Sequence, residues 1–279
     1  MIKSISYWSM QQGLANTHPI ADALAEVKDA GFDGLELCIS TEGALTTETS
    51  QTDCEALRGK IEASGVVVET LASGMSWGFN PTSDDKAVRE KSLKLHTAAL
   101  QRAAWLGCKA MLFVPGVVKS PIAADIIRYD TAVQRAKDAV AHLLEVAEKV
   151  GVDLCVENVW NGLFYSPVEF AEFIDQFKSE RCAIYFDVGN VMGYHQHPPH
   201  WIEILGSRIR RVHIKDFKQD IGSLAGFCDL TAGDVPWEQS MQALSAIGYD
   251  KTLVAEMIPW DPSVLKRTSA AMDWILSLA

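Results

Sequence analysis

One short pattern recurs along this chain of 279 residues and constrains its fold more than any other feature. In each copy an apolar-striped segment ends at a glycine, one or two residues follow, and an aliphatic or β-branched run begins. A glycine in that position is typical of the left-handed residue that ends a helix before the chain turns into a strand. Six helix-to-strand joints are therefore predicted, at Gly31, Gly65, Gly107, Gly151, Gly206 and Gly248.

The strands expected beside these joints form a set of eight that alternates with helical segments. With about 35 residues per unit, this alternation predicts an α/β fold of the (β/α)8 TIM-barrel type. An open doubly wound sheet is the rival fold, but it needs a glycine-rich phosphate turn after its first strand, and residues 8–13 do not form one. No linker divides the chain, so we expect a single TIM-barrel domain over residues 1–279. The predicted strands are 2–7, 34–38, 66–71, 110–114, 153–157, 183–187, 211–215 and 252–256.

Two of the intervening helices carry specific signals. Residues 129–150 place apolar side chains at spacings of three and four, which predicts one buried face. Ser166, Pro167 and Glu169 have the order of an N-cap, a first helical residue and a capping-box partner. In a barrel of this kind the connections that follow the strands emerge at one rim, where we expect the functional site.

Four residues that bind metal ions in other proteins stand at the predicted ends of strands. They are Glu157, Asp187, His213 and Glu256, from the fifth, sixth, seventh and eighth strands. An ionised carboxylate at the end of a buried strand is costly unless it is paired or coordinated, so four such residues at one rim indicate a shared cation. Three carboxylates and an imidazole suit Mn²⁺, Mg²⁺ or Co²⁺, and Zn²⁺ fits with expanded coordination. A cap for the following loop or a buried core histidine is the structural alternative for each residue alone.

The charge balance argues against some classes of partner. The chain carries 25 basic and 36 acidic residues, a net charge of −11, and therefore lacks the positive field that nucleic acids or anionic membranes require. No apolar run is long enough to cross a bilayer and no secretion signal is visible, so we expect a cytoplasmic protein. Nothing in the sequence specifies an oligomer, although a homo-oligomer is compatible with it.

Residues 151–260 resemble a known superfamily. The segments V-E-N-V-W-N, Y-F-D-V-G-N, V-H-I-K-D-F and V-A-E-M are similar to those of the xylose isomerase-like sugar isomerases and epimerases, nearest the branch of L-ribulose-5-phosphate 3-epimerases and hexulose-phosphate isomerases. The resemblance implies a TIM barrel with Glu157, Asp187, His213 and Glu256 as ligands of one divalent ion, Mn²⁺ being the first candidate. It also implies that Glu157 and Glu256 act as the acid/base pair.

Other residues near the predicted strand ends are candidates for substrate binding. Lys215 follows His213 by two residues and should point the same way, to bind an oxygen or stabilise charge, unless it is a surface lysine. Asp216 is its partner or a cap. Asn190 replaces the His found in similar free-ketose epimerases, and Glu36 is expected to hydrogen-bond the substrate or a neighbour. Flat aromatic faces suit sugar C–H groups, and two of four tryptophans are expected in the pocket: Trp8, Trp77, Trp160 and Trp260.

The leading functional hypothesis is a metal-dependent isomerase or epimerase that acts on a small sugar or sugar phosphate. Proton transfer beside the carbonyl would pass through a metal-stabilised enediolate, as in a ketose 3-epimerase. The same residues could instead drive β-elimination, as in a lyase or dehydratase acting on an oxo-sugar, an inosose or a 3-oxo-glycoside. A sugar-binding subunit without turnover is the third alternative. His195, His197 and His200 form either a polar loop near the pocket, which we favour, or a second metal site.

Overall fold

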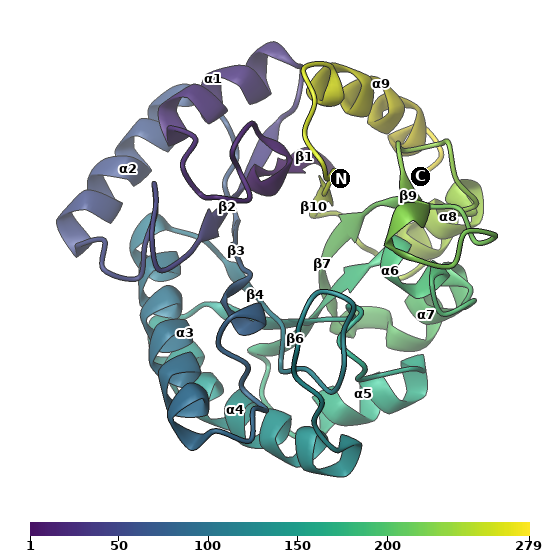
Figure 1. Cartoon of the computed structure of the whole chain (residues 1–279). Helices are drawn as coiled ribbons and strands as arrows, with labels where there is room; N and C mark the ends of the chain where they lie inside the picture. Colours follow the sequence, from purple (N-terminus) through teal and green to yellow (C-terminus); the bar gives the residue numbers. More distant parts are fainter.

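The chain forms a closed barrel of parallel strands with helices outside it. The structure, a computed structural model, describes residues 1–279. Figure 1 looks into the barrel, whose strand order is β1-β10-β7-β6-β5-β4-β3-β2, and shows the helices as an outer ring. The predicted single-domain TIM barrel is therefore confirmed. The barrel strands are β1 (Ile2–Ser6), β2 (Gly34–Ile39), β3 (Thr70–Ser73), β4 (Ala110–Phe113), β5 (Asp153–Glu157), β6 (Cys182–Asp187), β7 (Ile209–Ile214) and β10 (Thr252–Ala255).

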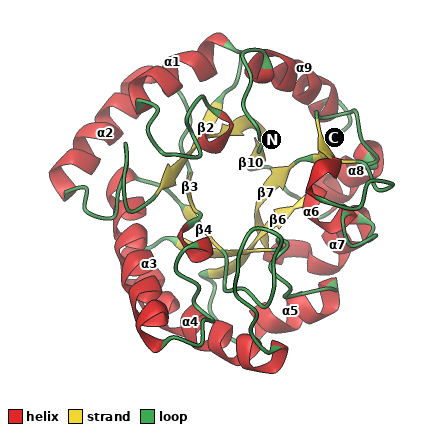
Figure 2. Cartoon of the chain, viewed as in Figure 1, coloured by secondary structure: helices red, strands yellow, loops and turns green.

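The outer layer consists of helices that follow the strands, coloured red in Figure 2. The helix predicted over residues 129–150 has those bounds, and the Ser166 hydroxyl accepts a hydrogen bond from the Glu169 amide at 3.2 Å. None of the helices is both long and apolar enough to serve as a membrane span. The helices are α1 (Ile20–Asp29), α2 (Gln51–Ser64), α3 (Lys86–Leu106), α4 (Tyr129–Val150), α5 (Pro167–Asp175), α6 (Val188–Met192), α7 (Pro198–Leu205), α8 (Trp237–Ala246) and α9 (Val264–Leu276).

The predicted strands agree with the structure to within two residues except at the start of β3, and one short strand pair was not predicted. All six joint glycines have positive φ. The strand predicted over 66–71 starts late, because Val67 forms only an isolated bridge to Gly34 and regular pairing begins at Thr70. The short antiparallel pair β8 (Asp216–Phe217) and β9 (Phe227–Cys228) was not predicted, since two-residue strands leave no periodic signal.

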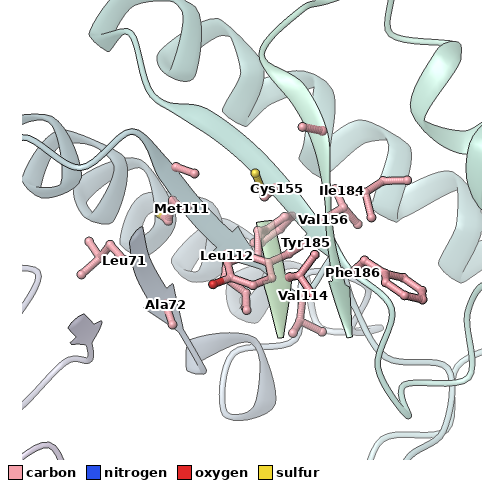
Figure 3. Close-up of a cluster of buried hydrophobic side chains, with 14 of the residues drawn as sticks. Leu71, Ala72, Met111, Leu112, Val114, Cys155, Val156, Ile184, Tyr185 and Phe186 are labelled. Atoms are coloured by element: carbon pink, nitrogen blue, oxygen red, sulfur yellow. The ribbon is translucent and has the colours of Figure 1, made fainter. Parts of the chain in front are cut away.

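The barrel strands are buried on both faces, which explains their apolar runs. Consecutive residues such as Leu71 and Ala72 in β3, or Met111 and Leu112 in β4, are all buried although they point to opposite sides. Figure 3 shows these side chains with their neighbours from β5 and β6. A parallel sheet covered by helices has no solvent face, so alternation of polar and apolar residues disappears within it. Polar side chains then gather at the strand ends, where the candidate site lies.

His96 of α3 forms hydrogen bonds that connect the outer helix layer to the rim of the barrel. Its side chain is fully buried, Nδ1 donates to the Ser92 carbonyl at 2.9 Å, and Nε2 accepts from the Ser73 hydroxyl at 3.2 Å. Ser73 ends β3 and lines the cavity described below. Burial lowers the pKa of His96 to about 4, so the folded protein keeps this imidazole neutral.

The first prediction concerns the pH dependence of stability that His96 causes. Because its pKa is lowered from 6.5 to about 4 on folding, its stabilising contribution is complete above pH 6.5 and is lost as the pH falls toward 4. The loss amounts to about 3 kcal/mol over that window. Urea unfolding of the wild type and of His96→Gln from pH 4 to 7 measures it. Equal slopes in the two proteins would contradict this assignment.

Candidate metal and active site

The four predicted metal ligands converge at the C-terminal rim of the barrel. Glu157 ends β5, Asp187 ends β6, His213 is paired with Asp187 in β7, and Glu256 directly follows β10. One ligand atom from each lies within 4.8 Å of the others. All four are buried, with Asp187 and His213 fully so. Residues far apart in sequence therefore meet because adjacent strands end at one level.

The imidazole of His213 is held from one side and left open on the other. Its Nε2 lies 2.8 Å from Glu36 Oε1, so this nitrogen carries the proton that Glu36 accepts. Its Nδ1 is buried without a hydrogen-bond partner. The nearest oxygens to Nδ1 belong to Glu157 at 3.4 Å, Glu256 at 3.5 Å and Asp187 at 3.9 Å.

This arrangement fits a divalent cation. A neutral imidazole would turn the Nδ1 lone pair toward three carboxylates, which is repulsive unless a proton or a cation lies among them. Three carboxylates and one imidazole are ligands that Mn²⁺ and similar ions accept. Burial alone lowers the pKa of His213, but Glu36, Glu157 and Glu256 outweigh burial and raise this pKa well above its usual value. The cluster therefore attracts positive charge to its centre.

Lys215 supplies part of that positive charge. Its ammonium lies 2.8 Å from Asp187 Oδ2 and also contacts Glu256 Oε2. Burial lowers the pKa of Lys215, but these two carboxylates outweigh burial and raise it, so the side chain stays charged. Burial raises the pKa of Glu157 to about 7, whereas Lys215 and His213 overcome burial at Glu256 and lower its pKa. The two glutamates thus differ in proton affinity.

Asp187 is both a helix cap and a member of the cluster. Its Oδ1 accepts from the Asn190 amide at 2.8 Å and so caps α6, while Oδ2 faces Lys215. Asn158 fixes its backbone from both sides, because the amide group of Asn158 accepts from the Asp187 N–H and donates to its carbonyl, each at 2.8 Å. Asn190 also donates to the Asn158 carbonyl at 3.0 Å. These bonds hold the ends of β5 and β6 together.

The side chains of Glu36 and Asp216 form hydrogen bonds within the protein and do not line the cavity. Glu36 is fully buried between His213 and Tyr185, whose hydroxyl donates to it at 2.5 Å. Of the two expectations for Glu36, the structure therefore favours a bond to a neighbour. Asp216 accepts bonds from backbone amides and from the Trp237 indole at 3.0 Å, so it anchors the loop after β7 instead of pairing with Lys215.

A cavity of about 530 Å³ opens above the cluster. Glu157, Glu256, Lys215 and Asn190 line its polar part. Three of the four candidate tryptophans line it, rather than two: Trp8, Trp77 and Trp160, while Trp260 does not.

Trp160 is locked in place at the cavity wall. Its indole donates to the Asn190 carbonyl at 2.8 Å and packs edge-on against Phe217. A Cβ at Gly193 would lie 1.9 Å from the Trp160 ring, so only glycine fits beside it. Of the three histidines expected in a polar loop, His195 and His197 precede α7, whereas His200 lies within that helix. All three stand outside the cavity lining and outside the cluster that could hold a metal ion.

Comparison with known proteins places this architecture in a family. The family of xylose isomerase-like TIM barrels matches residues 24–278. The chain belongs to this family. It is 24% identical over 261 residues to the L-ribulose-5-phosphate 3-epimerase UlaE of Escherichia coli O1:K1, covering 91% of this chain and 88% of that protein.

Solved structures share the fold over almost the whole chain. D-psicose 3-epimerase of Clostridium cellulolyticum H10 superposes with a TM-score of 0.80 at 20% identity, covering 100% of this chain and 99% of its own. The 3-keto-D-glucoside 4-epimerase of E. coli superposes with a TM-score of 0.76 at 15% identity, covering 99% and 100%. At these identities the likeness shows the fold, while the family match and the relationship to UlaE support an enzyme of the sugar isomerase and epimerase type.

Two positioning residues were not predicted. Tyr185, in the middle of β6, reads as an apolar core residue in the sequence, and nothing there indicates its bond to Glu36. Asn158 directly follows Glu157 in the V-E-N segment. A polar amide side chain next to a predicted metal ligand is therefore a signal from which its positioning role could have been predicted. Both act on the cluster through its neighbours.

The second prediction tests Glu36 as the residue that orients His213. Glu36→Gln keeps the size of the side chain but removes the charge that fixes the Nε2 proton, so Mn²⁺ affinity should fall about 10- to 100-fold. Titration with Mn²⁺, followed by electron paramagnetic resonance of the free ion, measures this loss. Glu145→Gln, at an exposed position on α4 outside the cluster and the cavity, is the control. Unchanged affinity in a folded Glu36→Gln protein would refute the role.

Proposed function

We propose that this chain is a divalent-cation-dependent sugar epimerase that moves a proton at the carbon beside a ketone, with the ketose 3-epimerase reaction as first candidate. The observation that carries the proposal is that Glu157 and Glu256 reach one cavity from β5 and β10, strands that β6 and β7 separate. Epimerisation removes a proton from one face of a carbon and returns one to the other face, which two flanking carboxylates suit. The relationship to UlaE supports the same reaction class.

The cation would be held by Glu157, Asp187, His213 and Glu256. When bound, it supplies Lewis acidity that stabilises negative charge on the substrate carbonyl oxygen. Mn²⁺ is our first candidate, and Mg²⁺, Co²⁺ and Zn²⁺ are the alternatives to be compared.

The other groups of the cavity bind and orient the sugar. One glutamate of the pair takes the proton and the other returns one, and the roles exchange in the reverse reaction. Lys215 holds the Glu256 carboxylate in the cavity, and its ammonium stabilises negative charge that develops on a sugar oxygen. Trp8 and Trp77 offer flat faces to the C–H groups of the sugar and exclude water from the reacting carbon.

The third prediction concerns the acid/base pair. Glu157→Gln and Glu256→Gln should each lower the rate of epimerisation about 10²- to 10⁴-fold, because one of the two proton transfers loses its carrier. Rates on L-ribulose and D-psicose in D₂O, followed by NMR, measure the loss and show whether deuterium enters at C3. Glu145→Gln should retain the wild-type rate.

Other outcomes of that experiment would redirect the assignment. Wild-type rates in either mutant would refute the pair. Deuterium at C1 or C2 would indicate an aldose-ketose isomerase. Release of water or an alcohol with an unsaturated product would indicate the lyase alternative, and no exchange with any keto-sugar would favour a binding protein.

The fourth prediction is loss of activity on removal of the cation. Dialysis against EDTA should abolish epimerisation, and Mn²⁺ should restore it, because only the bound cation would supply the Lewis acidity that stabilises negative charge on the substrate carbonyl oxygen. Calorimetry should give one bound ion per chain in the wild type and none in Asp187→Ala. Full activity in a sample shown to be free of metal would contradict the proposal.

A further inference from the structure

Large apolar side chains surround the mouth of the cavity and are exposed to solvent. Four of them are between 40% and 63% exposed while also lining the cavity: Leu14, Ile122, Leu224 and Ile258. They come from four different connections, between β1 and α1, β4 and α4, β8 and β9, and β10 and α9. In Figure 2 these connections lie around the barrel opening and are green, apart from the short red helical turns within the β1–α1 and β8–β9 connections. We call these four residues the apolar rim.

The cavity therefore changes character with depth. Its floor holds Glu157, Glu256 and Lys215, whereas the upper wall consists of the apolar rim together with aromatic side chains. A sugar carries an oxygen on every carbon, and its C–H faces suffice for the tryptophans of the cavity, so a sugar alone would leave the rim facing mainly hydroxyl groups or water. Exposed apolar surface is covered favourably only by another apolar group, at about 25 cal/mol per Å².

The charges of the cavity do not provide for a phosphate. Lys215 is the only lysine, arginine or histidine among the lining residues, and Asp187 and Glu256 already hold it. The three cluster carboxylates and Glu36 contribute −4, Lys215 +1 and a divalent cation +2, so with a neutral His213 the site keeps a net charge of −1. A phosphate dianion at the far end of the substrate would meet no free cation, in a chain whose net charge is −11. Phosphate sites in proteins use arginine, lysine or free helix N-termini.

We propose that the substrate is a keto-sugar that carries an apolar group, such as an aryl or alkyl substituent, and no phosphate. The sugar lies at the floor, and the substituent lies against the apolar rim. This inference rests on the proposed epimerase function, because that function is what orients the sugar with its reacting carbon at the floor. It departs from the phosphorylated substrate in the name of the relative UlaE.

Matched probes that differ at one position test the proposal. L-ribulose, L-ribulose 5-phosphate and 5-O-benzyl-L-ribulose differ only at O5, and a parallel series uses D-fructose with its 6-phosphate and 6-O-benzyl ether. Binding to the Mn²⁺-loaded protein is followed by quenching of the cavity tryptophans. We expect the benzyl ethers to bind about tenfold or more tightly than the free sugars, because the phenyl ring covers the rim. The phosphates should bind no better than the free sugars.

Variants of the rim locate the effect. Leu14→Ser and Ile258→Thr should reduce the ratio of benzyl-ether to free-sugar affinity toward one. Ile204→Thr is the matched control, because Ile204 on α7 is 45% exposed but lies outside the cavity. It should leave the ratio unchanged.

Several results would overturn the inference. Tighter binding of the phosphates, or equal binding of benzyl ethers and free sugars, would refute the apolar subsite. A shift from oligomer to monomer in the rim variants, measured by light scattering, with an unchanged affinity ratio would instead make the rim a contact between copies. If benzyl ethers bind preferentially but no keto-sugar exchanges deuterium, the proposed epimerase function fails while the subsite stands.

Discussion

The imidazole of His213 lies between one buried carboxylate, Glu36, and three more at the rim, and the geometry of the site depends on this position. Glu36 fixes a proton on Nε2 and thereby turns Nδ1 toward Glu157, Asp187 and Glu256. Four carboxylates around one ring would repel one another in a low-dielectric interior. Lys215 offsets part of that repulsion, and a divalent cation would offset the rest.

The barrel makes this concentration of charge possible. Its strands are fixed on both faces by apolar contacts, so their ends cannot move apart to relieve the repulsion. Asn158 adds a direct clamp between the ends of β5 and β6. The stability of the apolar barrel thus offsets the cost of a site that the chain would not assemble from loops alone, and this agrees with the rule that function sits at the rim of a rigid scaffold.

Much of the fold followed from local signals, and so did the cluster. The glycine at each joint indicates a backbone conformation, and the apolar runs between the joints indicate burial. Both signals depend on residues that are close together in the sequence. The cluster could be predicted because the parallel strands of one barrel must end at the same rim, which brings together Glu157, Asp187, His213 and Glu256.

Contacts between individual residues across the barrel could not be predicted from the sequence in the same way. The bond from Tyr185 to Glu36 joins residues 149 positions apart, and no periodicity encodes it. The late start of β3 depends on an isolated bridge, and the β8–β9 pair on only two residues per strand. Trp260 follows a strand end as Trp8 does, yet only Trp8 lines the cavity, because the direction of a loop is set by what it packs against.

The floor and the mouth of the cavity are formed by different parts of the fold and are therefore subject to different structural constraints. The floor is built from strand ends whose spacing the barrel imposes, so its chemistry can remain while the sequence around it changes. The mouth is built from connections such as those carrying Leu14 and Ile122, which can change length and polarity without disturbing the strands. A relative named for a phosphorylated ketose and a chain with an apolar rim can therefore share one mechanism of proton transfer and differ in what is attached to the sugar.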